Sequence, residues 1–148
     1  MKTFYRKLIY IAFLAYLAVL FYLLFFSSYR NGVRGIIDYN LIPFTTIGRY
    51  FSNYHGMSAT DQLAGNILAF VPFGIFTTLL FGKWVDPLRV AALSFSLSML
   101  AELAQFTFRV GAFDVDDLIL NTLGGILGCL IAKMVSHRKR GQTLTPRG

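Results

Sequence analysis

The chain has 148 residues, of which 55% are hydrophobic and 14% are charged, with a mean hydropathy of +0.58. Soluble domains carry about 25% charged residues, so this composition excludes an ordinary soluble domain and indicates an integral membrane protein. The net charge of +7 comes mainly from basic residues beside apolar stretches, which suits anionic lipid headgroups and disfavours nucleic-acid binding.

Four apolar stretches predict an all-α bundle of four transmembrane helices, because each is close to the roughly 20 residues that cross a bilayer. In chain order they are Leu8–Phe26, Leu63–Phe81, Leu88–Phe108 and Asp117–Val135. The first is longer than the apolar core of a typical signal peptide, so we expect it to remain as a helix. We therefore predict one membrane domain over residues 1–135 of a multi-pass protein of the cell membrane.

The connections between these stretches predict the topology. Ten of the fourteen basic residues lie before the first stretch, around the connection between the second and third, or at and after the end of the last. By the positive-inside rule, both termini are expected to be cytoplasmic. The long connection Ser27–Asp61 is then extracytoplasmic, and its aromatic segment Thr45–Tyr54 is predicted to form an interfacial helix over the bundle; an ordinary loop on lipid is the alternative. Residues 136–148 are basic, lack an apolar pattern and are predicted to be disordered.

The third stretch carries polar side chains that hydrocarbon does not tolerate alone. Glu102, Gln105 and Arg109 follow the spacing i, i+3, i+7, which places them on one face of a helix. Charged and amide groups inside a bilayer need a polar partner or a wet cavity. This face is therefore expected to line a site, although Arg109 alone could extend its charge to the interface.

Two other stretches carry polar groups at a similar depth. With a rise of about 1.5 Å per residue, Asn66, Gln105 and Asn121 lie roughly 6 Å below the outer helix ends, and Glu102 lies roughly 10 Å below. Asp117 shares the face of Asn121. Three helices would thus bring polar groups to one level beneath the long connection. Each amide alone could instead be a simple hydrogen bond between helices.

The remaining features favour structural roles. Asp114 and Asp116 belong to an acidic turn that is either solvated or caps the last helix. Close packing explains the small residues of the last two helices, and Cys129 is expected to be a packing residue. The chain has no P-loop, no paired cysteines and no H-E-x-x-H motif. The small residues attributed to close packing are Ser94 and Ser98 in the third stretch and Gly124, Gly125 and Gly128 in the fourth.

Four strings resemble a known family in their order along the chain. They are "YNLIPFTTIGRYF" at Tyr39–Phe51, "GNILAFVPFG" at Gly65–Gly74, "AELAQF" at Ala101–Phe106 and "FDVDDLILNTLGGILG" at Phe113–Gly128. The chain resembles the VanZ-like family of small bacterial membrane proteins. Some members carry an arginine three residues before the first aspartate of the acidic run. Here that position is Gly111, and Arg109 lies two residues earlier.

The resemblance implies a link to teicoplanin resistance, and the family has been grouped with membrane enzymes that exchange or cleave lipid headgroups. Our first hypothesis is an enzyme acting on a phosphate-bearing lipid headgroup or a lipid-linked cell-wall intermediate. Glu102 or Asp117 would be the general base. Mg²⁺, Mn²⁺ or Ca²⁺ could bridge carboxylates and phosphate. The substrate-binding candidates are Asn66, Gln105, Arg109, Asp114 and Asn121.

The second hypothesis is a membrane protein without catalytic activity that binds or shields lipid-linked precursors or the antibiotic. The same polar groups would then form a recognition site, and conservative changes would weaken binding gradually. A third hypothesis is a scaffold subunit whose polar face meets a partner helix. Convergence of polar groups from three helices of one chain disfavours this reading.

Overall fold

Four long helices dominate the chain, as the computed structural model shows for residues 2–26, 39–52 and 57–142. Each contains a stretch long and apolar enough to cross a membrane. The predicted class, an all-α protein with four spanning helices, is therefore confirmed. The helices are α1 (Lys2–Phe26), α4 (Met57–Phe81), α5 (Pro87–Thr107) and α6 (Val115–Gln142).

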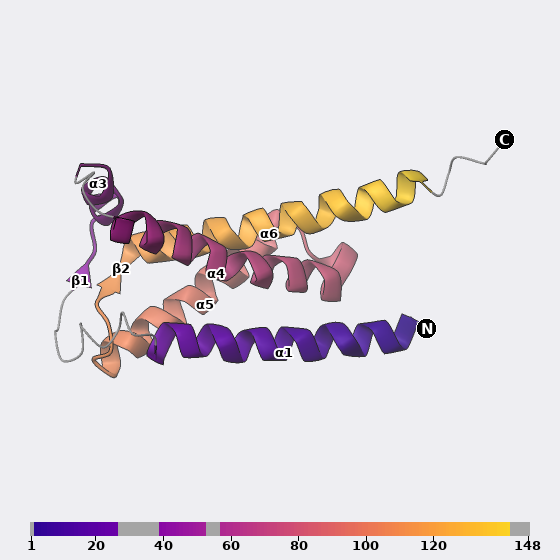
Figure 1. The fold of residues 1–148 in the computed structure, drawn as a ribbon, viewed down its shortest axis with the longest axis horizontal. Helices are drawn as coiled ribbons and strands as arrows, with labels where there is room; N and C mark the ends of the chain where they lie inside the picture. Colours follow the sequence, from indigo (N-terminus) through magenta and orange to yellow (C-terminus); the bar gives the residue numbers. More distant parts are fainter. Residues whose placement is uncertain (1, 27–38, 53–56, 143–148) are drawn as a thin grey trace.

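The short elements gather at one end of the bundle. The strands β1 (Tyr39–Asn40) and β2 (Phe113–Asp114) and the helix α3 (Thr45–Ser52) lie there (Figure 1). The amino-terminal end of α1 and the carboxyl-terminal end of α6 lie at the opposite end, near the 3-10 turn η1 (Gly82–Trp84). The assignment of this second end to the cytoplasm stays a prediction.

Two helix boundaries differ from the predicted ones. α6 continues to Gln142, so the prediction that disorder begins at Ser136 is wrong for residues 136–142. This segment holds good helix formers and no proline, so the helix can continue into water once it leaves the bilayer. α4 begins at Met57, within the predicted connection. The rest of the basic tail, residues 143–148, lies outside the described residues.

The segment before α4 forms the predicted short helix, whose place at the membrane interface stays a prediction, and a contact that the sequence did not predict. α3 covers Thr45–Ser52 of the expected Thr45–Tyr54, and residues 53 and 54 are outside the described part. β1 pairs in parallel with β2, with Tyr39 opposite Phe113 and Asn40 opposite Asp114. A two-residue strand is too short to show an alternating pattern. The pairing brings the segment that precedes α3 to the connection between α5 and α6.

Glycines bring α4 and α6 into backbone contact. A Cβ on Gly124 would collide with the carbonyl oxygen of Ile67, and one on Gly128 would collide with that of Val71. On the facing helix, a Cβ on Gly74 would collide with the carbonyl oxygen of Gly125. Only residues without a side chain permit this distance between helices. The close packing predicted from the small residues of α6 is therefore confirmed.

α1 packs on α4 through aromatic and aliphatic side chains and presents its other face outward. Leu20 is buried against Phe70 and Phe73. The hydroxyl of Tyr16 donates a hydrogen bond of 2.7 Å to the backbone carbonyl of Ala69. This bond lies within one turn of Pro72, which has no N–H to donate to its own helix. Only 6% of the spanning window of α1 is buried, which suits a helix surrounded by lipid.

We expect Gly128→Ala to destabilise the bundle by about 1–3 kcal/mol, because the added methyl group meets backbone that cannot rotate away. Gly65→Ala is the matched control, since a Cβ there has no neighbour within 4 Å and the gain in helix propensity is the same. Unfolding of both variants in mixed detergent micelles, followed by circular dichroism, measures the difference. Equal stability of the two variants would contradict the role assigned to this contact.

Candidate functional site

Asp116 is a fully buried carboxylate that caps the start of α3 from another helix. It lies in the first turn of α6 and is 0% exposed. Its Oδ1 accepts the N–H of Phe44 at 2.6 Å, and its Oδ2 accepts those of Thr46 and Ile47 at 2.8 and 3.0 Å. These groups belong to the amino-terminal turn of α3, whose N–H groups lack partners within the helix. The prediction that Asp116 is solvated or caps its own helix is therefore wrong.

Asp114 caps α6 and joins the two strands to α3. Its Oδ1 accepts the backbone N–H of Asp116 at 2.8 Å, so one of the two capping alternatives considered for the acidic turn is confirmed. The same oxygen accepts Nδ2 of Asn40 at 3.0 Å, and Oδ2 accepts the hydroxyl of Thr46 at 2.6 Å. Asp114 thus lies within a network of protein hydrogen bonds that holds the segment from β1 to α3 against the start of α6.

Glu102 is buried beneath this network. It is 2% exposed, and its Oε2 accepts the backbone N–H of Asp114 at 3.1 Å. A carboxylate at this depth needs such donors because no water is available to solvate it. Glu102, which the sequence predicted as a site residue, therefore links α5 to β2 just before the start of α6.

Two of the amide side chains predicted as site residues join neighbouring helices. Asn66 of α4 donates from Nδ2 to Oδ1 of Asp117 in α6. Asn121 is 3% exposed and donates to the hydroxyl of Ser98 in α5 at 2.8 Å. Asn66 and Asp117 are half-buried, whereas Asn121 is enclosed. The Asn66–Asp117 pair is thus more accessible than the Asn121–Ser98 pair.

The side chain of Gln105 binds the carboxyl-terminal turn of α1. It is 0% exposed and donates from Nε2 to the carbonyl oxygen of Leu24 at 2.9 Å. The last four carbonyl groups of a helix have no partner within the helix, so the amide satisfies one of them. Its own Oε1 is buried and has no hydrogen-bond partner among the described residues. The amide nitrogen of Gln105 therefore makes a structural contact, whereas its amide oxygen accepts no hydrogen bond from the described residues.

Arg109 does not join the buried groups. α5 ends at Thr107, and Arg109 follows in the left-handed conformation with φ of 54° and an exposed side chain. The predicted spacing from Glu102 assumed that the helix continued to Arg109. Because the helix ends first, Arg109 lies in the connection between α5 and β2, and its side chain is exposed. Arg109 is the predicted site residue that the structure separates from the others.

The carboxylates do not converge into a metal centre. Within the part of the chain that the structure describes, no three His, Cys, Asp or Glu side chains lie close enough together to hold a metal ion. The oxygens of Asp114 and Asp116 instead accept hydrogen bonds from the protein. The donor set therefore does not fit the divalent cation considered from the sequence, and no chemical step is assigned to one.

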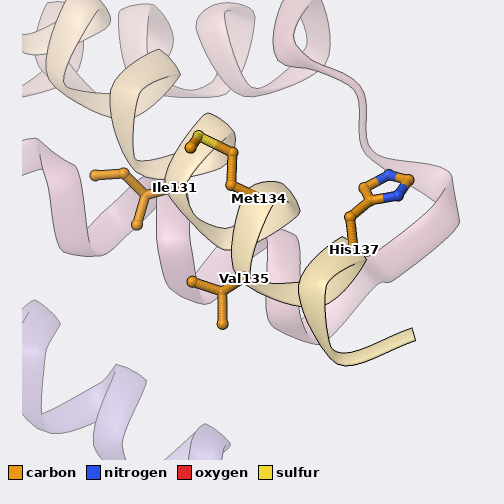
Figure 2. Close-up of a pocket in the computed structure, with 4 residues that line it drawn as sticks. All are labelled: Ile131, Met134, Val135 and His137. Atoms are coloured by element: carbon orange, nitrogen blue, oxygen red, sulfur yellow. The ribbon is translucent and has the colours of Figure 1, made fainter. Parts of the chain in front are cut away.

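A hollow of about 420 Å³ lies near the other end of α6 (Figure 2). It is lined by Ile131, Met134, Val135 and His137 and is mainly apolar. Its nearest lining residue is 15 positions from Asp116, or roughly 22 Å along the helix. The hollow is therefore distinct from the polar groups at the α3 end.

The family follows from comparison with known proteins. A family model described as VanZ/LLP1 matches residues 13–136. The chain belongs to the VanZ/LLP1 family. It is similar to Protein VanZ of Enterococcus faecium, with 33% identity over 118 residues that cover 76% of this chain and 66% of the relative. The chain thus spans slightly less than two thirds of that relative, and no solved structure matches it. Family and helices together show a multi-pass membrane protein.

Sequence reasoning missed three residues that organise this VanZ/LLP1 site. Asn40, Thr46 and Asp116 form hydrogen bonds across more than 60 positions of sequence, which no local pattern reveals. A signal was nevertheless present, because all three lie within the strings that carry the family resemblance. Polar residues such as Asn40 and Thr46, outside the spanning helices, are therefore candidates for the site as much as polar residues inside those helices.

We expect Asp116→Ala to release the start of α3. The loss removes charge-assisted hydrogen bonds of about 1.5–3 kcal/mol each, so hydrogen exchange at Phe44, Thr46 and Ile47 should accelerate roughly tenfold or more. Asp116→Asn keeps one acceptor oxygen and should give a smaller increase. Exchange measured by mass spectrometry in detergent tests both variants.

Asp86→Ala is the control for this experiment. Asp86 also caps a helix, by accepting the N–H of Arg89 at 2.8 Å, but its side chain is 53% exposed and it lies near η1. This control should leave exchange in α3 unchanged. Unaltered exchange in Asp116→Ala would show that α3 is held by other contacts.

Proposed function

We propose that this VanZ/LLP1 protein acts on a phosphate-bearing lipid headgroup or a lipid-linked cell-wall intermediate at a polar site in the outer leaflet. The Asn66–Asp117 pair is the observation that carries the proposal, because it puts a half-buried carboxylate between two spanning helices. The outward direction of this end rests on the distribution of basic residues. A lipid that enters from the side would present its headgroup at this level.

Asp117 is the proposed general base. The amide of Asn66 binds one of its oxygens and thereby orients the carboxylate. Asp117 takes a proton from water or from an acceptor hydroxyl, and the resulting oxygen nucleophile attacks phosphorus. The bond between phosphorus and the leaving oxygen breaks, and Asp117 returns the proton to that oxygen. Water as nucleophile gives hydrolysis, and an acceptor alcohol gives headgroup transfer.

Glu102 is assigned a positioning role in this scheme. Its contact with the N–H of Asp114 anchors the connection that leads into α6 and so sets the position of Asp117 three residues later. Its near-complete burial separates it from a ligand in the lipid phase. The sequence offered Glu102 or Asp117 as the base and gave Glu102 the greater weight, whereas the difference in burial favours Asp117.

Charge limits which headgroup can approach. Glu102, Asp114, Asp116 and Asp117 lie near one end of the bundle, and their combined charge repels a bare phosphate. Exposed Arg109 lies in the connection between α5 and β2 and can contribute a counter-charge with two donors to phosphate oxygens. A headgroup that carries an amine beside its phosphate would complement the carboxylates as well.

We expect Asp117→Asn to lower the rate of headgroup turnover at least about 100-fold, the contribution typical of a general base. Glu102→Gln retains an oxygen that can accept the N–H of Asp114, so it should reduce turnover less than Asp117→Asn. The control is Asp86→Asn, which changes an exposed carboxylate near η1. Mass spectrometry of lipids and cell-wall precursors from cells making each protein measures the headgroup change.

A change in headgroups that persists in Asp117→Asn would reject Asp117 as the base. Loss of turnover in Glu102→Gln but not in Asp117→Asn would transfer the role to Glu102. If no headgroup differs between cells with the wild-type protein and cells without it, the enzymatic proposal is wrong.

Binding without catalysis is the second candidate function. It is favoured by the many carboxylate oxygens that already accept hydrogen bonds from the protein, as in Asp114 and Asp116. In this case the protein would bind or shield lipid-linked precursors or teicoplanin, in line with the resistance that the family resemblance implies. Recognition then depends on shape and hydrogen bonds, and each substitution weakens it by a limited amount.

For this second function we expect protection against teicoplanin to rise in proportion to the amount of protein, because each molecule shields one ligand. Asp117→Asn should then lower protection partially, by a factor set by one lost hydrogen-bonding group. Susceptibility measured over a range of expression levels tests this expectation. Full protection at trace expression would instead indicate turnover.

A further inference from the structure

Three large apolar side chains project from the segment between β1 and α3. Leu41 is 60% exposed, Ile42 is 69% exposed and Phe44 is 64% exposed. They are nearly consecutive, interrupted only by Pro43, and lie at the end of the bundle rather than along a spanning helix. Clustered apolar residues in such a place mark a surface that contacts something other than water.

Hydrogen bonds hold the backbone of this segment while its apolar side chains stay exposed. Asn40 binds Asp114 with its side chain, and its Oδ1 accepts the N–H of Ile42 at 3.1 Å. Phe44 has a φ of 66°, which is unfavourable for a residue with a side chain. The buried carboxylate of Asp116 holds it there by accepting its N–H at 2.6 Å. Strain maintained by a buried partner commonly marks a functional segment.

The depth of this segment follows from its bond to α6. Asp116 is the second residue of the spanning stretch Val115–His137. Its 23 residues extend about 34 Å, slightly more than the roughly 30 Å hydrocarbon core. Asp116 therefore lies close to the edge of the hydrocarbon, and Phe44, bonded to it, lies at the same level. Exposed apolar groups at this edge face the zone where headgroups meet acyl chains.

We propose that Leu41, Ile42 and Phe44 form an apolar finger that inserts into the lipid bilayer at the interface beside α3. The occupant of this surface is membrane lipid, since Phe44 is bonded to Asp116 at the start of the spanning stretch of α6 and the three exposed side chains are apolar. Burial of such side chains in the interface anchors the segment in the way that amphipathic elements bind membranes. The inference is independent of any chemistry at Asp117.

Tryptophan fluorescence tests the finger directly. Trp84 is the single tryptophan, so Trp84→Phe gives a background without signal, and Ile42→Trp places a reporter in the finger. The variant is reconstituted in vesicles of phosphatidylcholine and phosphatidylglycerol whose acyl chains are brominated close to the headgroup. We expect emission shifted to shorter wavelength, strong quenching by the brominated lipid and weak quenching by aqueous acrylamide.

Leu100→Trp in the same background is the matched reference. Leu100 is 65% exposed and lies inside the spanning helix α5, so this reporter should be quenched best by lipids brominated deep in the chain. Circular dichroism identical to the parent protein confirms that each variant keeps its helices. Adding Asp116→Asn to Ile42→Trp should weaken lipid quenching if the carboxylate directs the finger.

Two results would overturn the proposal. Quenching of the Ile42→Trp reporter by acrylamide but not by brominated lipid would place the segment in water. Protection from both quenchers would show that protein covers the finger, such as a second copy of the chain. Either result leaves the proposal for Asp117 untouched, because the lipid analysis tests that site separately.

Discussion

The carboxylate of Asp116 is the contact on which the α3 end of this molecule depends. It is completely buried, yet it satisfies three N–H groups at the start of α3 that would otherwise lack partners at the edge of a membrane. A charge buried in this way is tolerable because every donor around it is a fixed backbone group. The segment from β1 to α3 is consequently fixed to the helix bundle by hydrogen bonds.

A second constraint, the close approach of α4 and α6, makes the polar level possible. Gly124 and Gly128 let the two backbones meet, and about two to three turns before them along α6, Asn66 reaches Asp117. Short side chains such as Asn and Asp can bridge helices only when the helices are near each other. The hydrogen bond between Asn66 and Asp117 therefore depends on the close packing that the glycines of α4 and α6 allow.

The sequence predicted what depends on local pattern and missed what depends on distant contacts. The four apolar spans followed from hydropathy, and the helix α3 followed from a segment rich in aromatic residues. The placement of Arg109 failed because the sequence did not show where α5 ends. Asp116 was misjudged because its partners lie about 70 residues earlier in the chain. In both cases a short-range rule was applied to a residue whose environment is set by tertiary structure.

The way α1 is attached bears on how the protein assembles. Its polar contacts with later helices, Tyr16 to Ala69 and Gln105 to Leu24, join residues 53 and 81 positions apart. During synthesis α1 enters the bilayer before either partner exists. Because little of its spanning window is buried, α1 can remain in the bilayer as a separate helix until the other helices are inserted. Insertion of single helices followed by their packing is the two-stage view of membrane protein folding. Because these contacts join α1 to residues synthesised later, α1 can pack against the bundle only after α4 and α5 have formed.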